Sequence, residues 1–448
     1  MTSRETPPAD LLVDPVAPAP RRRRVHPGIL VAAVAFIALL GAAGFRAAPS
    51  VLMVPLQEEF GWSRGVLSLA VGINLVLFGL TAPFAAALMD RFGIKQVVSV
   101  ALVVIAAGSG FAVFVTASWQ LVLLWGVLIG LGTGSMALVF AATIAGRWFV
   151  KRRGLVTGVL TAGSATGQLI FLPIIAAATQ SSGWRTASII IAIAALAVVP
   201  LVLLFLHNHP ADRQVTPYGA PADEIVVPPT RQKGSAMRAI RVLREASHHR
   251  TFWALVAGFA ICGATTNGLI GTHFIPAAHD HGMGEVTAAG LLAVVGVFDI
   301  VGTIASGYLT DRFNPRVLLA VYYGLRGVGL VMLPGMLSDS VHPSVIAFVI
   351  VYGLDWVATV PPTVALCRQA FGENGTIVFG WVFASHQLGA AAMSVAAGFL
   401  RDQTGAYTIA WFGAAGMCLV AALVSFQIRR LPTGVSGTSR SGGTPETA

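Results

Sequence analysis

Five side chains that can carry charge stand inside long apolar stretches of this sequence: Arg46, Asp299, Arg326, Asp355 and His386. An ionised side chain at the centre of a bilayer costs roughly 2.5–3.5 kcal/mol on insertion scales, so each one needs a partner or a purpose. An arginine offers a carboxylate a planar fork of donors, and a buried carboxylate beside it can take up and release a proton. The chemistry that these residue types could perform is the binding of an organic anion coupled to a proton.

The apolar stretches that hold these residues are expected to span a membrane. Of the 448 residues, 55% are apolar and 11% are charged, whereas soluble domains carry roughly 25% charged residues. A transmembrane helix needs about 20 apolar residues, and runs of this length predict an all-α integral membrane protein with twelve transmembrane helices. We expect the spans near 28–55, 65–89, 96–116, 119–145, 154–178, 186–206, 252–277, 286–310, 316–336, 343–367, 376–400 and 407–427.

The sequence also repeats itself. Asp90-Arg91-Phe92 closes one apolar run and Asp311-Arg312-Phe313 closes another at an offset of 221, while Gly183 and Gly405 are 222 residues apart. Two similar membrane-embedded copies are the common plan of secondary transporters, in which a substrate site forms between the copies near the bilayer midplane. We therefore expect a disordered tail at 1–27, six-helix bundles at 28–206 and 251–430, a linker at 207–250 and a disordered tail at 431–448.

The basic residues are distributed unevenly around these spans. Of the 29 Lys and Arg residues, 24 lie in the tails and in the loops after spans 2, 4, 6, 8 and 10, whereas Arg64, Arg185 and Arg401 lie in the opposite loops. Because basic residues accumulate in cytoplasmic loops, we expect a multi-pass protein of the plasma (inner) membrane with both termini in the cytoplasm. The net charge of +10 then reflects this topology and attraction to anionic lipid, and no nucleic acid partner is expected.

Two segments have more than one interpretation. Ser235 to His249 in the linker could form a short amphipathic helix on the membrane surface or a solvated connector. His279-Asp280-His281 could ligate a metal, but three residues without a fourth ligand favour a solvated outer loop. We expect no metal, no cofactor and no enzymatic activity, since the sequence shows no nucleophile with a base, no metal cluster and no phosphate-binding loop.

The loop after the second span carries a family signature. Asp90-Arg91-Phe92-Gly93-Ile94-Lys95 fits the pattern Asp-Arg-x-Gly-x-Lys/Arg, and the second copy at 307–316 fits it loosely. In these motifs, and over nearly the whole chain after residue 25, the sequence resembles the major facilitator superfamily. The segments 148–154 and 61–65, Trp-Phe-Val-Lys-Arg-Arg-Gly and Gly-Trp-Ser-Arg-Gly, resemble the monocarboxylate transporter group and its bacterial branch. An acidic-Gly-aromatic motif of the first span is missing, and Thr303 stands where the group has an arginine in span 8.

This resemblance implies roles for the charged residues. Spans 1, 4, 7 and 10 line the central cavity in the superfamily, which places Arg46 and Asp355 beside the substrate path. We expect Arg46 to hold the anionic head of the substrate; the alternative is a permanent pair with Asp355 or with helix-end carbonyls. Asp299 is the expected counter-ion of Arg326, which would replace the missing arginine of span 8; the alternative is a static buried pair. Asp299 and Asp355 are the candidates for proton coupling.

Polar residues in the spans complete the expected site. His386 is equivalent to Ser164 in the other copy, which favours a cavity-facing position, with a packing histidine as the alternative. Asn267 is equivalent to Phe45, the neighbour of Arg46, and Gln168 also lies inside a span. Asn267 and Gln168 are candidates for substrate binding, with hydrogen bonds between helices as the alternative. Arg326 and His386 are candidates for substrate binding as well, and substrate or proton binding would compete for the expected pair of Asp299 with Arg326.

The Asp-Arg loops are expected to act as gates. Asp90, Arg91, Asp311 and Arg312 end their spans at the cytoplasmic face. Charge pairing and helix-end dipoles there could hold the two halves together in the outward-open state, although either loop alone could be a solvated turn.

These features predict a monomeric transporter in a lipid bilayer that moves a small organic anion, with monocarboxylates as the expected class, together with a proton by alternating access. An exchanger or an exporter of carboxylates or amphiphilic compounds is the alternative within the same class. A transport-dead membrane sensor is the alternative from another class, but the linker and tails leave no room for a folded signalling domain.

Overall fold

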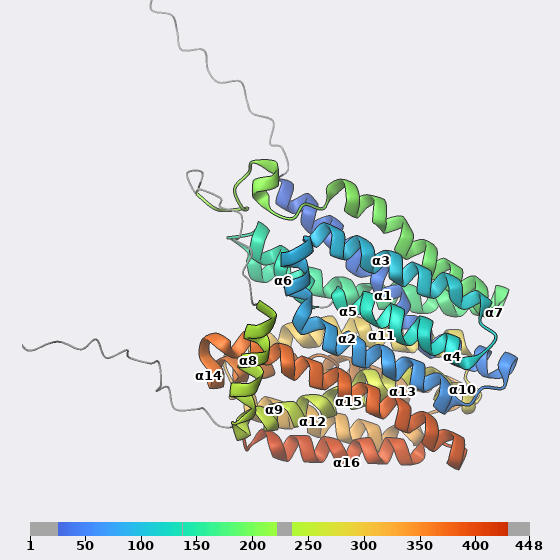
Figure 1. The fold of residues 1–448 in the computed structure, drawn as a ribbon. Coiled ribbons are helices and arrows are strands. Elements are labelled where there is room, and N and C mark those ends of the chain that lie inside the picture. The colour runs from blue at the N-terminus through green and yellow to red at the C-terminus, as the bar shows by residue number, and fades with distance from the viewer. Residues whose placement is uncertain (1–25, 137, 222–234, 429–448) are drawn as a thin grey trace, which may run out of the picture.

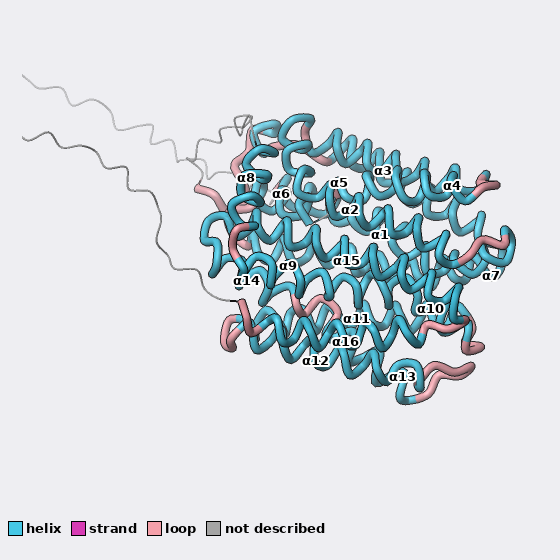
Figure 2. Tube along the Cα trace, turned by 60° about the horizontal axis from the view of Figure 1, so that its bottom comes forward, coloured by secondary structure: helices cyan, strands magenta, loops and turns pink. Residues whose placement is uncertain are grey.

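The computed structural model describes residues 26–136, 138–221 and 235–428. Long helices run side by side as one bundle, and the loops gather at its two ends (Figures 1 and 2). Apart from His26 and Pro27, the expected tails lie outside the described residues, as does segment 222–234 of the linker.

The first half contains six long helical segments, some of which are divided into shorter helices. Its last helix breaks at Gly183, whose φ of 81° and ψ of 163° are not helical, so this helix supplies two spans. Gly405, the equivalent position of the second copy, also has a positive φ, 74°, as glycine adopts more readily than other residues. The helices are α1 (Pro27–Phe60), α2 (Arg64–Phe92), α3 (Ile94–Phe111), η1 (Ala112–Phe114), α4 (Ser118–Leu121), η2 (Val122–Ile129), α5 (Gly130–Ser135), α6 (Leu138–Trp148) and α7 (Arg153–Phe205).

The linker and the second half follow the same plan. The described part of the linker contains a 3-10 turn and one helix, and the second half contains six further long helical segments. They are η3 (Pro210–Arg213) and α8 (Ser235–Ser247) in the linker, then α9 (Arg250–Gly263), η4 (Ala264–Ile270), α10 (Gly271–Asp280), α11 (Glu285–Thr310), α12 (Pro315–Met332), η5 (Leu333–Gly335), α13 (Pro343–Asp355), α14 (Val360–Phe371), η6 (Gly372–Asn374), α15 (Gly375–Thr404) and α16 (Thr408–Ser425).

The bundle has twelve spans. Among the described residues, ten helices are long and apolar enough to cross a membrane. The break at Gly183 divides one of these ten into two spans. The more polar α15, a helix of 30 residues, supplies the twelfth span. The ranges expected from the sequence agree with the observed helices to within a few residues.

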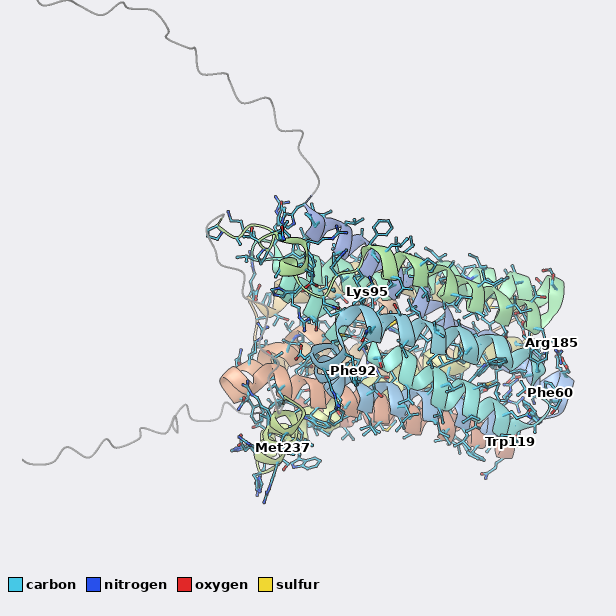
Figure 3. All side chains as sticks on the ribbon, turned by 45° about the horizontal axis from the view of Figure 1, so that its top comes forward. Phe60, Phe92, Lys95, Trp119, Arg185 and Met237 are labelled. Carbon is cyan, nitrogen blue, oxygen red and sulfur yellow. The ribbon has the colours of Figure 1, made fainter. Side chains whose placement is uncertain are left out.

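Both chain ends of the bundle lie together. We call the end at which α1 begins and α16 ends the basic end, because its loops and the adjoining tails hold most of the Lys and Arg residues. Figure 3 shows Met237 near this end, and Phe60, Trp119 and Arg185 at the opposite end.

The two halves meet mainly along two pairs of helices, α2 with α15 and α7 with α11, and α1 also packs against α10. Glycines allow the first pair to pack closely. A Cβ atom added at Gly72 would lie 2.6 Å from Val395 Cγ2, and one added at Gly79 would lie 2.6 Å from Gln387 Cβ. Small residues at such contacts let helix backbones approach where the lipid supplies no hydrophobic drive for association.

Candidate functional site

A cavity lies near the middle of the helices that line it. It is bounded by α1, α2, η2 and α5 of the first half and by η4 and α10 of the second half. Its volume is about 50 Å³, on a measure in which one water needs about 10–15 Å³, so it can hold a few waters or a small solute. Its lining combines aromatic and aliphatic side chains with polar ones: Phe45, Pro49, Val71, Asn74, Leu75, Phe78, Trp125, Thr133, Asn267, Gly271 and Thr272.

In three of the spans around this cavity, the backbone departs from regular α-helix where the span meets the cavity. Pro49 in α1 has no N–H, so the carbonyl of Phe45 lacks its usual helical donor. Trp125 and Asn267 lie in η2 and η4, which are π-helical segments. Such segments occur often at functional sites, and irregular backbone inside a membrane is tolerated where it lines a cavity. Among these irregularities, the proline in α1 leaves the carbonyl of Phe45, a cavity-lining residue, without a helical donor.

The tenth span is broken beside the same cavity. α13 ends at Asp355 and α14 begins only at Val360. Trp356, in the break, reaches the cavity wall, since a Cβ atom added at Gly271 would lie 3.9 Å from its ring. A break of this kind leaves carbonyl groups at the end of one helix and N–H groups at the start of the next without helical partners.

Charged side chains satisfy both sides of this break. Arg326 Nη2 donates to the carbonyl of Asp355 at 2.7 Å. Asp299 Oδ1 accepts the backbone N–H of Val357 at 3.1 Å and the hydroxyl of Thr303 at 3.0 Å. The cation therefore lies at the C-terminal end of α13 and the anion lies ahead of α14, which are the signs that the helix dipoles favour.

Arg326 forms its ion pair with Asp355, so the expected pair with Asp299 is wrong. Arg326 Nε lies 2.6 Å from Asp355 Oδ2, and the two residues are 1% and 5% exposed. The guanidinium also donates to Cys262 Sγ at 3.1 Å and Thr265 Oγ1 at 3.3 Å on the seventh span. The prediction failed because α13 and α14 pack against both α11 and α12, while α11 and α12 hardly touch each other. Asp355 of the intervening span reaches the guanidinium instead.

The structure brings some of the predicted substrate residues to the cavity. Asn267 lines it. The side chains of Arg46 and Gln168 lie outside the described part of the structure, and their backbones belong to α1 and α7. Arg326 and His386 are not among the described residues that form the cavity wall.

His386 is packed among aromatic rings on α15. Its ring stacks on Phe383, with centroids 5.9 Å apart and planes at 6°, and lies 4.9 Å from the ring centroid of Phe259. Its backbone carbonyl occupies the position that a Cβ atom on Gly263 would take, so the seventh and eleventh spans are in very close contact here. This environment matches the packing alternative for His386.

The four residues of the Asp-Arg loops lie at the basic end. Asp90 pairs with Arg147, which is also in the first half. The guanidinium of Arg91 lies 5.1 Å from the ring centroid of Phe92, and that of Arg312 lies 4.0 Å from that of Tyr308. Asp311 and Arg312 are exposed. Among described residues, no ion pair or hydrogen bond joins the two halves through these loops in this conformation.

A cluster that the sequence did not reveal joins the halves at the opposite end. We call Arg64, Asp280, Arg401, Asp402 and Tyr407 the inter-half lock. Arg64 of α2 is only 4% exposed and binds the carboxylate of Asp280 in α10 with two bonds, of 2.7 and 2.8 Å. Arg64 also donates to the Tyr407 hydroxyl at 3.0 Å, and Arg401 donates to Asp280 at 2.8 Å. A two-bond arginine–carboxylate pair fixes both position and orientation.

Two further contacts extend the lock. The carboxylate of Asp402, at the end of α15, accepts the backbone N–H groups of Arg64 at 3.0 Å and Gly65 at 2.7 Å, and so caps the start of α2 from the other half. His273 is fully buried and bonds the Tyr407 hydroxyl at 3.1 Å and the Ser394 carbonyl at 2.8 Å. Because the carbonyl can only accept, Nε2 of His273 is the donor there.

The basic-residue bias contained the signal for this lock. Arg64, Arg185 and Arg401 are the three basic residues of the loops opposite the basic end. In the structure each pairs with a carboxylate: Arg64 and Arg401 with Asp280, and Arg185 with Glu59 at 2.6 Å. A cation on the disfavoured side is therefore a marker for a fixed ion pair.

Arg64→Gln is expected to open this end of the bundle, because it leaves Asp280 without its two-bond partner. We expect the ratio of separated to closed conformers to rise at least about tenfold, which corresponds to about 1.4 kcal/mol. Electron–electron distance measurements between spin labels at Ser182 and Ser340, which are exposed in opposite halves, would report the change. Arg185→Gln is the matched control, since its pair with Glu59 lies within the first half. Equal distance distributions for Arg64→Gln and wild type would contradict the lock.

Two six-helix halves around a cavity of mixed polar and apolar lining, with irregular backbone at that cavity and a buried ion pair at the break in the tenth span, define a multi-span membrane protein of the transporter class. The chain matches the Major Facilitator Superfamily model over residues 33–379, and it belongs to that family. It is a membrane transporter and not an enzyme.

Similar proteins agree with this assignment. The chain is 26% identical over 402 residues to "Uncharacterized MFS-type transporter YcxA" of Bacillus subtilis, covering 89% of this chain and 93% of that protein. It is 26% identical to monocarboxylate transporter 11 of Mus musculus, covering 91% and 88% of the two chains, and 29% identical to monocarboxylate transporter 13 of Bos taurus, covering 79% and 77%.

Solved structures share the fold at low identity. A bacterial homolog of the human lysosomal transporter Spinster, in an inward-facing and unoccupied conformation, has a TM-score of 0.68 at 15% identity, with 91% of this chain and 99% of that chain covered. A D-xylose-proton symporter also has a TM-score of 0.68 at 15% identity, with 89% and 97% covered.

Proposed function

We propose that this transporter moves a small organic anion of the monocarboxylate class together with a proton, by rocking residues 28–206 against 251–430. The observation that carries the proposal is the place of Arg46 in α1, in the turn between Phe45 and Pro49, which both line the cavity. An arginine in that turn offers two parallel donors to a carboxylate. The names of the relatives, monocarboxylate transporters 11 and 13, support the same substrate class.

The cavity suits a short anion with an apolar part. Asn74 donates to the carbonyl of Trp125 at 2.7 Å and so joins two helices, whereas the Asn267 side chain makes no hydrogen bond to a described residue and is open to a ligand. Phe78 and Trp125 supply apolar surface. In this proposal Asn267 and Gln168 contact the substrate beside Arg46, and Arg326 and His386 act on it indirectly, through the packing of the seventh, tenth and eleventh spans.

Asp355 is the proposed proton site, and Asp299 assists it at the break. Arg326 holds Oδ2 of Asp355, while Oδ1 is buried and has no hydrogen-bond partner among described residues. An unpartnered buried oxygen is costly, and a proton on it would neutralise the carboxylate. Loss of that charge would weaken the grip of Arg326, which also bonds Thr265 beside the cavity-lining Asn267. Proton binding at Asp355 would thus alter the contacts of Thr265 and so the position of Asn267 at the substrate site.

The conformation supports a gating scheme. We propose that the basic end faces the cytoplasm of a plasma (inner) membrane, with both termini there, as the distribution of basic residues favours. The inter-half lock then closes the outward side. When it opens, Asp90, Arg91, Asp311 and Arg312 would meet across the halves and close the cytoplasmic side.

A panel of short carboxylates tests the proposal. Purified protein in liposomes that contain a pH dye should acidify the lumen faster than passive leak when one of these acids is added, and Arg46→Gln should abolish the difference. No signal over the whole panel, with folded protein in the liposomes, would overturn proton-coupled monocarboxylate transport. Uptake that occurs only with internal counter-substrate would instead identify an exchanger.

A further inference from the structure

The linker helix α8 has features that the transport scheme does not use. It crosses the basic end at a steep angle to the long helices (Figure 1) and packs against α2 of the first half and α9 and α15 of the second. Its packed face is small and apolar: Ala239, Val242 and Ala246 are 8%, 4% and 2% exposed. Trp381 of α15 donates its indole N–H to the carbonyl of Ala239 at 3.0 Å and holds the helix in place. Helix α8 is therefore a fixed surface element rather than only a solvated connector.

The other face of α8 is cationic and partly apolar. Arg241 and Arg244 follow Met237 at spacings of four and seven residues, which places all three on one side of the helix, and Arg238 flanks them. All three arginines are exposed, and none forms an ion pair with a described residue. Met237 is 62% exposed and Ile240 is 46% exposed. Exposed apolar groups beside arginines on one helix face are typical of helices that lie in the membrane–water interface.

This face lies where lipid headgroups would be. Figure 3 shows Met237 at the edge of the bundle near the basic end, with its side chain beyond the ribbons of the spans. Trp253, at the start of α9, is 56% exposed and donates its indole N–H to the carbonyl of Ser247, the last residue of α8. Exposed tryptophans beside the ends of spans are typical of the membrane–water interface. The neighbouring Arg250 is also exposed.

We propose that α8 binds the headgroups of acidic phospholipids in the leaflet at the basic end, with Arg238, Arg241 and Arg244 on the phosphates and Met237 and Ile240 in the acyl boundary. The segment 235–250 has four arginines and one glutamate, so its charge complements an anionic surface. Because α8 touches both halves, the bound lipid sits against the surfaces that move during rocking. Transport then depends on the acidic lipid content of that leaflet.

Binding of phosphatidylglycerol to the full-length protein tests this site. In detergent, phosphatidylglycerol should bind the wild type at least about tenfold more tightly than phosphatidylcholine, since each basic residue near an anionic surface adds about fivefold. The variant Arg238→Gln/Arg241→Gln/Arg244→Gln should lose this preference and keep its helical content and melting temperature, because the three side chains are exposed and unpaired. Soluble glycerol phosphate should bind neither protein detectably.

The matched control neutralises three basic residues elsewhere at the same end: Lys151→Gln/Arg213→Gln/Arg316→Gln. It should keep the preference for phosphatidylglycerol. An equal loss of preference in both triple variants would overturn the site, since it would show only general attraction to the basic end. An unchanged preference in the α8 variant, or equal binding of the two lipids to wild type, would overturn it as well. Glycerol phosphate binding that follows the α8 arginines would identify a free-phosphate site instead of a lipid site.

Discussion

Arg326→Gln should lower the free energy of unfolding by about 3–5 kcal/mol, because it leaves the carboxylate of Asp355 buried without a counter-charge. The loss has a second source, since the guanidinium also satisfies the carbonyl of Asp355 at the end of α13. Denaturation in mixed micelles, followed by tryptophan fluorescence, would measure the change.

Removing both charges should restore most of this stability. The variant Arg326→Gln/Asp355→Asn leaves no unpaired ion, so its ΔΔG should be well below that of either single change. Arg185→Gln serves as the exposed control, because its pair with Glu59 has side chains that are 46% and 38% exposed, and such pairs contribute about 0.2–1 kcal/mol. A single Arg326→Gln variant as stable as Arg185→Gln would refute the buried pair.

The double variant also separates stability from proton coupling. If Asp355 carries the proton, the folded double variant should bind substrate but should not drive proton movement with it. Coupled transport at the wild-type rate in the double variant would exclude Asp355 from the proton pathway and leave Asp299 as the candidate.

Arg46→Gln should weaken substrate binding about 100-fold. Hydrogen bonds to charged groups contribute about 1.5–3 kcal/mol, and about 1.4 kcal/mol corresponds to a tenfold change in affinity. The substrate affinity of Arg46→Lys should lie between that of the wild type and that of Arg46→Gln, since an ammonium keeps the charge but loses the planar fork. Calorimetric titration with the most active carboxylate of the panel would give the three affinities.

Equal melting temperatures would show that the Arg46 variants are folded. Wild-type affinity in Arg46→Gln would remove this residue from the substrate site and with it the main support for an anionic substrate. Asn267→Ala provides a graded comparison, because a neutral amide on the cavity wall should contribute less than the arginine.

The sequence predicted the helices well because span length and hydrophobicity are local properties. The duplication also carried structural information, since Gly183 and Gly405 both take a positive φ between the last two spans of their half. The presence of Arg326, Asp299 and Asp355 inside spans was equally visible. What hydropathy cannot give is the rotation of each span about its axis, or which spans are neighbours.

Hydropathy therefore cannot predict which of the buried charged residues form ion pairs with each other. Asp299 and Arg326 lie on consecutive spans, which suggested a pair, but α13 and α14 pack against both α11 and α12. The sequence predicts one continuous span over 343–367, whereas the structure breaks it after Asp355. Pro361 and Pro362 at the start of α14 are the local signal for this break, because a proline cannot supply the helical N–H to the carbonyl four residues before it. The side chains that satisfy the break, Arg326 and Asp299, come from two other spans, and no local pattern encodes that tertiary arrangement.

The inter-half lock was missed for a different reason. Asp280 stands between two histidines in the sequence, while its partners Arg64 and Arg401 are 216 and 121 residues away. The three basic residues on the disfavoured side were the available clue. A cation on that side requires a fixed carboxylate partner, so these three residues predict ion pairs at that end.

Accumulation of substrate driven only by a pH gradient is the most direct test of proton-coupled anion transport. Proteoliposomes would hold equal concentrations of the active carboxylate inside and outside, with the lumen more alkaline by one pH unit. Symport of one proton with one monoanion predicts about tenfold accumulation, since one pH unit corresponds to about 1.36 kcal/mol. Wild-type proteoliposomes should reach this accumulation at a time when protein-free liposomes and Arg46→Gln proteoliposomes have taken up little carboxylate. Accumulation no faster than in those controls would contradict proton-coupled transport of this anion.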